Sequence, residues 1–528
     1  MVTIKRYICL FLSLIISLSG CSFREKTEDN SENAELIINE NNTVFRFAAE
    51  EANTLLPVCA IPQSLADAVD IIYEPLYDFD EVLNVIPVLA AGCTASGNTQ
   101  YKVDLKDNVY WHDGDEFTAS DVIYTVNALK KGESVYSPDV ENIKEVDVIN
   151  RHKVLFTLNR PTVNFEGLLS FPIIKRNTSL EQDSGAIPVG TGPYKFAEKR
   201  NNTYTFEKNE NWHGGEASDK TVTITLLKDK QSVIYAFEAN EADVISGSVL
   251  DLTKNTPKGK TLIRDYISRN LTFLGMNDEE GILSLPEVRR AIAYLIDKNE
   301  IIERNVYGRG EAVDVPIYPK AWFYDSALSS VEVAADGSYL ESILNENGWY
   351  KKDGLYTKDF GSYETELTLS VLVNSENEEK TSIAKSISKT LGDNGITVRV
   401  KVIPYEKYLG KIKDRDFSMF IGEIAMDKNM DPAGLVKSGE NYFGYKSEET
   451  DDILNKMYAA RGTEEVISKF GEFAGVFLRD MPFVPLFFRK DAMAYASNLA
   501  GFGMPDYYRP YRNIENWYFS QKVELNEK

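Results

Sequence analysis

The chain has 528 residues, which is too long for one simple core and predicts two to four domains. Hydrophobic residues make up 43% and charged residues 26%, so the composition is that of a folded protein and excludes a disordered chain. The net charge of −23 disfavours nucleic acid as a partner, because nucleic acid binds cationic surfaces. The 3 histidines in the chain leave little room for a His-based metal site, so we expect no metal. No cofactor is expected either.

The first 20 residues have the order of an export signal. Lys5 and Arg6 are a short basic segment, and the apolar run that follows, Tyr7–Leu18, is shorter than the roughly 20 residues that span a membrane. The run ends in Leu18-Ser19-Gly20-Cys21, which resembles the bacterial lipobox, where the cysteine receives a diacylglyceryl group. We therefore expect an extracytoplasmic protein anchored to the cell membrane by a lipid on Cys21. The alternative is a plain secretory signal with a chance cysteine.

Residues 21–42 are polar and acidic after the cysteine, and this composition predicts a disordered tether between the membrane and the folded body. Two cysteines remain in that body, Cys59 and Cys93. An exported location permits a disulfide between them, and two buried thiols fit the sequence equally well.

Alternating apolar residues predict strands at Val44–Ala48 and Thr221–Leu227. A helix is predicted to begin at Thr118, because Asp121 follows three residues later as in a capping box, and to run through Leu129.

A second capping box is predicted at Ser284-Leu285-Pro286-Glu287, with proline in the first turn. The apolar residues that follow recur at helical spacing as far as Ile296 and predict a buried helix face.

A βαβ unit is predicted nearer the C-terminus. Residues 367–373 and 396–402 alternate as strands, and between them Ile383, Ile387 and Leu391 lie on one helix face. This order predicts two parallel strands with a right-handed crossover. Residues 418–424 read as a further strand, and the class is mixed α/β.

The sequence contains no complete catalytic motif, so we expect no enzyme. Gly259-Lys260-Thr261 resembles the end of a phosphate-binding loop, but the first glycine that such a loop needs is replaced by Lys254. The two Ser-x-x-Lys matches, at Ser382 and Ser386, lack the Lys-Thr-Gly motif that accompanies them in penicillin-binding enzymes. The three histidines are scattered, with no partner at ligand spacing.

Several motifs occur in the order of a known family. Val109–Gly114 and Phe117–Val122 resemble its Trp-x-Asp-Gly turn and Thr-Ala-x-Asp-Val helix start. Pro188–Phe196 resembles its Gly-Thr-Gly-Pro-Tyr motif, and Asn209–Gly215 resembles the loop that follows. The family is the family 5 extracellular solute-binding proteins, the dipeptide-, oligopeptide- and nickel-binding components of ABC importers.

The resemblance implies an α/β fold: a two-lobed, periplasmic-binding-protein-like clamshell of type II, with an extra side domain and mixed sheets. It assigns 43–61, 186–270 and 491–528 to lobe one, 62–185 to the side domain and 271–490 to lobe two. It also implies one helix over Pro286–Ile302 at the entry to lobe two.

The resemblance also implies that the ligand is held between the lobes. In peptide binders of this family, an aromatic residue and then an aspartate that pairs with the ligand's ammonium follow a strand of lobe two. Here the tryptophan is absent, and Asp427 lies four residues before Asp431-Pro432 where the family usually has three. The anchoring carboxylate is therefore Asp427 or Glu423, unless both have other roles. The residues expected at the ligand are Glu50, Glu51, Ala52, Asn53, Phe273, Tyr405, Tyr408, Gly422, Glu423, Ile424 and Asp427.

The function implied is capture of a peptide ligand and its delivery to an ABC permease complex in the membrane, by a monomer that performs no covalent chemistry. Two alternatives keep the fold: a receptor for oligosaccharides or nickel–metallophore chelates, and a sensory lipoprotein. An exported hydrolase is a third alternative, with no nucleophile–base pair to support it.

Overall fold

The computed structural model describes residues 43–81, 83–181, 187–248, 261–279, 281–321, 323–324, 337–460 and 463–520. The predicted signal, the lipidation site Cys21 and the tether lie outside these ranges. Across the described ranges, no helix combines the length and the apolar character needed to cross a membrane.

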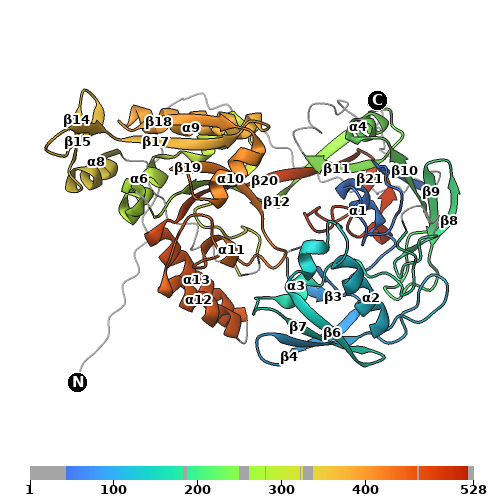
Figure 1. Ribbon diagram of the computed structural model, residues 1–528. Helices are drawn as coiled ribbons and strands as arrows, with labels where there is room; N and C mark the ends of the chain where they lie inside the picture. Colours follow the sequence, from blue (N-terminus) through green and yellow to red (C-terminus); the bar gives the residue numbers. More distant parts are fainter. Residues whose placement is uncertain are drawn as a thin grey trace, which may run out of the picture.

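One 11-stranded sheet runs through the whole molecule (Figure 1). Two long strands at its centre, β12 (Thr261–Met276) and β20 (Phe483–Ala496), pair antiparallel and connect the two halves of the structure. Their register shifts between Ile267 and Leu271, so an irregularity lies where the strands pass from one half to the other. The strand order is β18 (Thr397–Ile403), β17 (Thr368–Asn374), β19 (Met419–Ala425), β12, β20, β11 (Val244–Ser248), β1 (Val44–Glu50), β10 (Thr221–Leu227), β9 (Thr203–Lys208) and β8 (Tyr194–Arg200), with β13 (Gly310–Ala312) on β20.

The first lobe is the half that contains β1 and β8–β11. Its sheet is covered on one face by α1 (Gln63–Val69), whose apolar side chains pack with Phe45 and Phe47. The other face is covered by α4 (Lys230–Glu238), which packs on Ala48. The predicted boundaries assign α1 to the side domain, but Ser64 Oγ accepts a hydrogen bond of 3.0 Å from the Glu50 amide at the end of β1.

The side domain lies beneath the first lobe in Figure 1. Its four-stranded sheet has the order β4-β5-β7-β6, and α2 (Ala119–Leu129) packs against β6 and β7. Thr118 and Asp121 form the predicted capping box, with the Thr118 amide donating to Asp121 Oδ2 at 2.7 Å. The other elements are β2 (Tyr77–Phe79), β3 (Val85–Pro87), β4 (Ala90–Ala95), β5 (Gln100–Leu105), β6 (Ile143–Asn150), β7 (Lys153–Leu158) and α3 (Phe165–Leu168).

The second lobe contains the predicted βαβ unit. Strands β17 and β18 are parallel, and α9 (Glu378–Asp393) buries Ile383, Ile387 and Leu391, so this prediction is confirmed. The remaining helices and small strands are α6 (Pro286–Leu295), α7 (Lys298–Val306), α8 (Gly337–Glu346), β14 (Trp349–Lys352), β15 (Leu355–Asp359), β16 (Glu364–Glu366), α10 (Tyr405–Lys413), α11 (Ala433–Val436), α12 (Glu448–Ala459) and α13 (Thr463–Asp480). The chain then returns along β20 and ends in the first lobe with β21 (Leu499–Ala500) and β22 (Tyr518–Phe519).

Two predictions near residue 290 are wrong. The Ser284 hydroxyl donates to the Gly281 carbonyl at 2.8 Å, and α6 begins after Leu285 without a side-chain cap. The predicted helix to Ile302 is two helices, because Asp297 caps a new one by accepting from the Glu300 amide at 2.9 Å.

Cys59 and Cys93 are free thiols in the structure.

Candidate ligand-binding cleft

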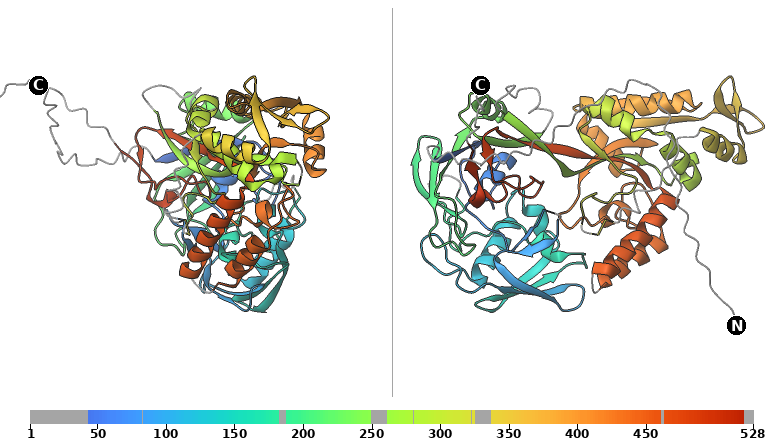
Figure 2. Two further views of the ribbon diagram at one scale, coloured as in Figure 1. Left: turned by 90° about the vertical axis from the view of Figure 1, so that its left-hand side faces the viewer. Right: turned by 180° about the vertical axis from the view of Figure 1, so that it is seen from behind.

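The strand directions bring the carboxyl ends of both half-sheets to the boundary between the lobes. β1 is parallel to β10 and β11, and all three run in the direction of β12, toward the second lobe. β17 and β18 run in the direction of β20, toward the first lobe. In open α/β sheets ligands bind outside the carboxyl ends of strands, so both lobes present a binding edge to this boundary (Figures 1 and 2).

A cavity of about 280 Å³ lies in the first lobe at the end of β1, where α1 and α4 approach from opposite faces of the sheet. This volume is near the lower limit of small-molecule pockets and suits one chemical group of a ligand better than a whole peptide. The cavity is lined by Glu50, Gln63, Ser64, Asp67, Lys230, Val233, Ile234, Ile245, Ser246, Gly247, Tyr266, Asp491 and Tyr507.

Three of the lining residues are acidic. Asp67 is held by Gln63 Nε2 at 2.8 Å and by Ser246 Oγ at 2.6 Å, and burial raises its pKa to about 6. Burial also raises the pKa of Asp491 to about 6, and no hydrogen bond or ion pair reaches its carboxylate from the described residues. Glu50 accepts from the Ser64 hydroxyl at 3.2 Å. The cavity is therefore electronegative, with Lys230 as its one lysine.

On the second lobe, Glu423 of β19 belongs to a charged cluster. Its Oε2 accepts from Thr272 Oγ1 at 3.3 Å and lies 3.8 Å from Lys380 Nζ and 3.7 Å from Arg489 Nη1. Arg489 also pairs with Glu379 in the first turn of α9. The Glu423 carboxylate is thus satisfied by protein groups, while a quarter of its side-chain surface stays exposed.

The other predicted carboxylate, Asp427, lies in the segment that follows β19. Its side chain keeps exposed surface, yet the protein around it desolvates the carboxylate enough to raise its pKa. The charge of Arg269 opposes this rise, and no side-chain hydrogen bond or ion pair of Asp427 occurs among the described residues. Asp427 is therefore available to a ligand, unlike Glu423.

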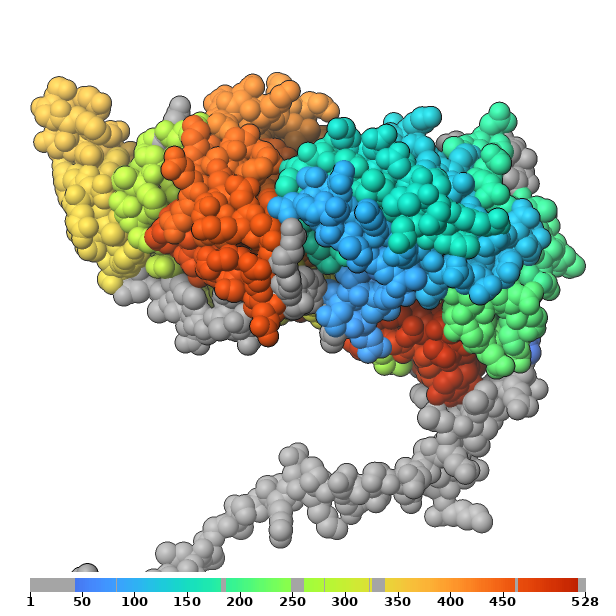
Figure 3. Space-filling view, turned by 90° about the horizontal axis from the view of Figure 1, so that it is seen from below, coloured from blue at the N-terminus to red at the C-terminus, as the bar shows by residue number. Residues whose placement is uncertain are grey.

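Residues next to Asp427 contact the side domain through an ion pair and a hydrogen bond. Lys428 Nζ lies 2.8 Å from Asp139 Oδ2, with both side chains buried. Asn429 Nδ2 donates to Thr162 Oγ1 at 2.7 Å. In Figure 3 the second lobe and the side domain meet along this side of the molecule.

The remaining predicted residues divide between the cleft and the core. Glu51 and Asn53 are exposed just beyond β1, with Ala52 partly buried between them. Tyr405, the first residue of α10, is 42% exposed at the carboxyl end of β18.

Four predicted residues serve the packing of the second lobe. Phe273 is 3% exposed within an aromatic cluster, so its place differs from the predicted ligand contact. A Cβ on Gly422 would lie 2.4 Å from the Phe273 ring, so a close approach of ring and backbone requires this glycine. Tyr408 is buried and donates to the Ile421 carbonyl at 2.6 Å, and Ile424 packs against the same core.

Sequence reasoning missed the cavity residues Asp67, Tyr266, Asp491 and Tyr507. One signal was present: three charged residues, ending in Asp491, interrupt the apolar strand Phe483–Ala496. Charges inside a buried strand need a partner or a function.

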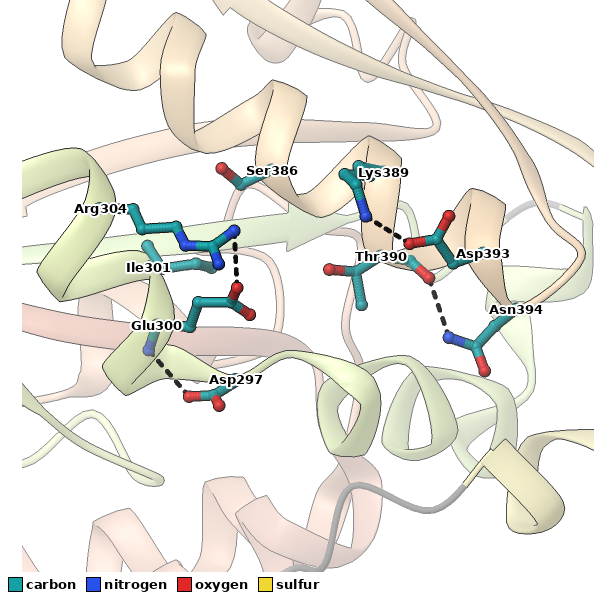
Figure 4. Close-up of a pocket in the computed structure, with 9 residues that line it drawn as sticks. All are labelled: Asp297, Glu300, Ile301, Arg304, Ser386, Lys389, Thr390, Asp393 and Asn394. Carbon is teal, nitrogen blue, oxygen red and sulfur yellow. Dashed lines mark hydrogen bonds and ion pairs between the residues drawn. The ribbon is translucent and has the colours of Figure 1, made fainter.

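A second, smaller pocket of about 170 Å³ lies between α7 and the end of α9 (Figure 4). Four of its charged groups form two ion pairs, Arg304 with Glu300 at 2.8 Å and Lys389 with Asp393 at 2.6 Å, and the fifth, Asp297, accepts from the Glu300 amide at 2.9 Å. It therefore contains fewer unpaired charged side chains than the cavity of the first lobe. In the described part of the chain, no group of three His, Cys, Asp or Glu residues is placed to hold a metal ion.

Two lobes that share one sheet, with facing carboxyl ends and a polar cavity in the first lobe, define a solute receptor of the clamshell type. Residues 84–442 match the bacterial extracellular solute-binding proteins, family 5 Middle, and the chain belongs to this family.

Individual relatives are distant in sequence and differ in how much of their length aligns with this chain. The oligopeptide-binding protein AppA of Bacillus subtilis is 22% identical, with 97% of this chain and 98% of the relative aligned. The nickel-binding periplasmic protein of Escherichia coli is 24% identical over 53% of this chain and 56% of its own length. Among solved structures, B. subtilis AppA with a nonapeptide has a TM-score of 0.61 at 21% identity, covering 90% of this chain and 99% of that one. The unliganded open form of the murein tripeptide binding protein MppA has a TM-score of 0.76 at 16% identity, covering 92% and 99%.

Proposed function

We propose that this protein captures peptides outside the cytoplasm and delivers them to an ABC permease complex, as a monomer that performs no covalent chemistry. The observation that supports this most is the unpaired Asp427 carboxylate beside the boundary of the lobes, since a peptide brings an ammonium group to such a site. The relatives named as oligopeptide-binding proteins support the same ligand class.

Binding would draw the lobes together about β12 and β20, where the register shift between Ile267 and Leu271 offers a place to bend. This shift supports the proposed boundary between lobe one and lobe two near residues 270 and 490. The contact of Ser64 with Glu50 supports moving the start of the side domain from 62 to beyond Val69.

Native mass spectrometry tests the ligand class. The chain from Ser22 to Lys528, which keeps every described residue, is purified without denaturant and then measured with and without collisional release of ligand. We expect a series of added masses that fragment to peptides. Uptake of defined peptides should then raise the free energy of unfolding by RT ln(1 + [L]/Kd), about 2.7 kcal/mol at a hundredfold excess over Kd. No bound peptide and no stabilisation by any peptide pool would refute the proposal.

A metal chelate is the second candidate, because the relatives include nickel-binding proteins. The solved neighbours include NikZ of Campylobacter jejuni in complex with Ni(L-His), with a TM-score of 0.63. A single added mass with the isotope pattern of nickel, in place of the peptide series, would favour it.

We further propose that a lipid on Cys21 holds the receptor at the outer surface of the cell membrane. The supporting observation is the order of basic segment, apolar run and Leu18-Ser19-Gly20-Cys21. Cys21→Ala should abolish labelling by a radioactive fatty acid and release the folded protein from the membrane fraction. Equal labelling of the variant would refute the anchor.

A further inference from the structure

The cavity at the end of β1 contains a carboxylate that the protein does not pair. Asp491 of β20 lies directly opposite Tyr266 of β12 in the antiparallel register, so both side chains project from the same face of the sheet. Both residues line the cavity. No hydrogen bond or ion pair to Asp491 occurs within the described ranges.

Tyr266 adds a second polar group to the wall of this cavity. Its side chain has 6% of its surface exposed, and no described residue forms a hydrogen bond with its hydroxyl. The hydroxyl is not one of the fully buried polar atoms that lack a partner, so its oxygen is reached from the cavity. An unpaired carboxylate and an accessible phenol oxygen, which can accept as well as donate, therefore face the same cavity.

The cations near Asp491 form no hydrogen bond or ion pair with its carboxylate within the described ranges, so the carboxylate still lacks a donor. Arg489 stands two residues away on β20 and pairs with Glu379, where Nη2 lies 3.3 Å from Oε2. The positive charges of Arg489 and Lys230 favour the ionised form of Asp491, and the charge of Glu423 opposes it. Asp67 and Glu50 add two more carboxylates to the same wall.

We propose that this cavity is a subsite for an organic cation of the captured ligand, an ammonium or guanidinium group, with Asp491 as its counter-ion. The Tyr266 oxygen accepts a second hydrogen bond from the cation, and the Tyr266 ring supplies an aromatic surface that cations favour. The Tyr507 ring of the same wall already holds the Arg269 guanidinium, 4.6 Å from its centroid. The subsite is separate from Asp427, because its lining residues come from the first lobe and the ends of β12 and β20. The proposal rests on the proposed peptide function and adds a preference to it: cationic ligands bind better than neutral ones.

The test compares alanine pentapeptides that differ by one charge. One series carries lysine at each position in turn, the matched series carries norleucine, and both are made with free and with acetylated N-termini. Titration calorimetry with the ligand-free Ser22–Lys528 chain should show at least about tenfold tighter binding of lysine than of norleucine at one position. Loss of affinity on acetylation, with no effect of lysine, would assign the subsite to the ligand's α-ammonium if Asp491→Asn abolishes that loss, and would overturn the subsite if the loss persists in Asp491→Asn, because Asp427 also offers a carboxylate to the α-ammonium.

Two variants and a matched control connect this preference to the cavity. Asp491→Asn should abolish the lysine or ammonium preference, so that lysine and norleucine peptides bind with equal affinity. Tyr266→Phe should weaken the preference about threefold to tenfold, in line with loss of one hydrogen bond to a charged group. Asp147→Asn removes the same charge from an exposed position of the side-domain strand β6 and should keep the wild-type preference.

The outcomes separate this inference from the function on which it rests. Peptide binding that is indifferent to lysine and to acetylation would overturn the cation subsite and leave peptide capture standing. A preference that survives Asp491→Asn would overturn it as well. Failure of every peptide to bind would overturn both proposals.

Discussion

Replacing Asp491 by asparagine should stabilise the unliganded protein at neutral pH. Burial raises the pKa of this carboxyl to about 6, against about 3.9 in an unfolded chain. Two pKa units at about 1.4 kcal/mol each give about 3 kcal/mol, an upper value because the cavity opens to solvent. Asparagine has the same shape and no charge to desolvate, so it escapes this cost.

The sign of the effect depends on pH. Above pH 6 both states of the wild type ionise Asp491, and the folded state bears the full cost of a poorly solvated carboxylate. As the pH falls from 6 to 4, the folded protein takes up a proton before the unfolded chain does, and the cost disappears. The gain from Asp491→Asn is therefore greatest at pH 7.5 and vanishes near pH 4. The neighbouring groups Glu50, Asp67, Lys230, Glu423 and Arg489 are present in both proteins and largely cancel in the comparison.

Urea denaturation followed by tryptophan fluorescence measures the difference directly. Both proteins are first freed of ligand by unfolding and dialysis, then compared at pH 4, 5, 6 and 7.5. We expect a midpoint shift toward higher urea that grows with pH, with Asp147→Asn giving no such trend. An equal shift at all four pH values, or destabilisation at pH 7.5, would refute the reasoning that Asp491 is an unpaired, poorly solvated carboxylate.

Three further variants test the cleft and its support. Asp427→Asn should weaken peptide binding about tenfold or more while the unliganded melting temperature stays within about one degree, because no protein group pairs with this side chain; an unchanged Kd would remove Asp427 from the site. Asn429→Ala should cost about 1–2 kcal/mol in urea denaturation, since it deletes the hydrogen bonds to Thr162 and to the Val163 carbonyl, while removal of a buried amide oxygen without a partner offsets part of this cost. Gly190→Ala should give little soluble protein, because the added Cβ would stand 1.8 Å from the Ile72 carbonyl oxygen; normal yield and stability would show that this contact relaxes cheaply.

Local patterns predicted the second lobe well because its core elements are regular. The alternation of residues 367–373 and 396–402 and the helical spacing between them reflect burial against a single core. The break between α6 and α7 was missed because the apolar spacing of α6 continues to Ile296 across the end of the helix. The Asp297–Glu300 pair, which caps α7, was the local signal that should have divided the helix.

The cavity could not be predicted by the same means. Asp67, Tyr266 and Asp491 are hundreds of residues apart, and they meet only because β12 and β20 cross the molecule and the first-lobe sheet assembles from three distant segments. A sequence motif is confined to one segment of the chain. The motifs therefore indicated the loop after β19 but not the first-lobe residues Asp67, Tyr266 and Asp491. Phe273 was misplaced for a related reason: its strand lies at the cleft, but its side chain faces the core.

The two walls of the cleft differ in how they hold their acidic groups, and the difference has a consequence for binding. Glu423 is neutralised within the second lobe by Thr272, Lys380 and Arg489. Asp491, in the first lobe, is left without a partner and costs stability for as long as the cavity is empty. A cation that enters therefore relieves a penalty in the first lobe, whereas at Glu423 it would have to displace existing contacts. Under the two proposals, Asp491 of the first lobe and Asp427 of the second lobe each receive a cationic group of the ligand, while Glu423 stays with its protein partners.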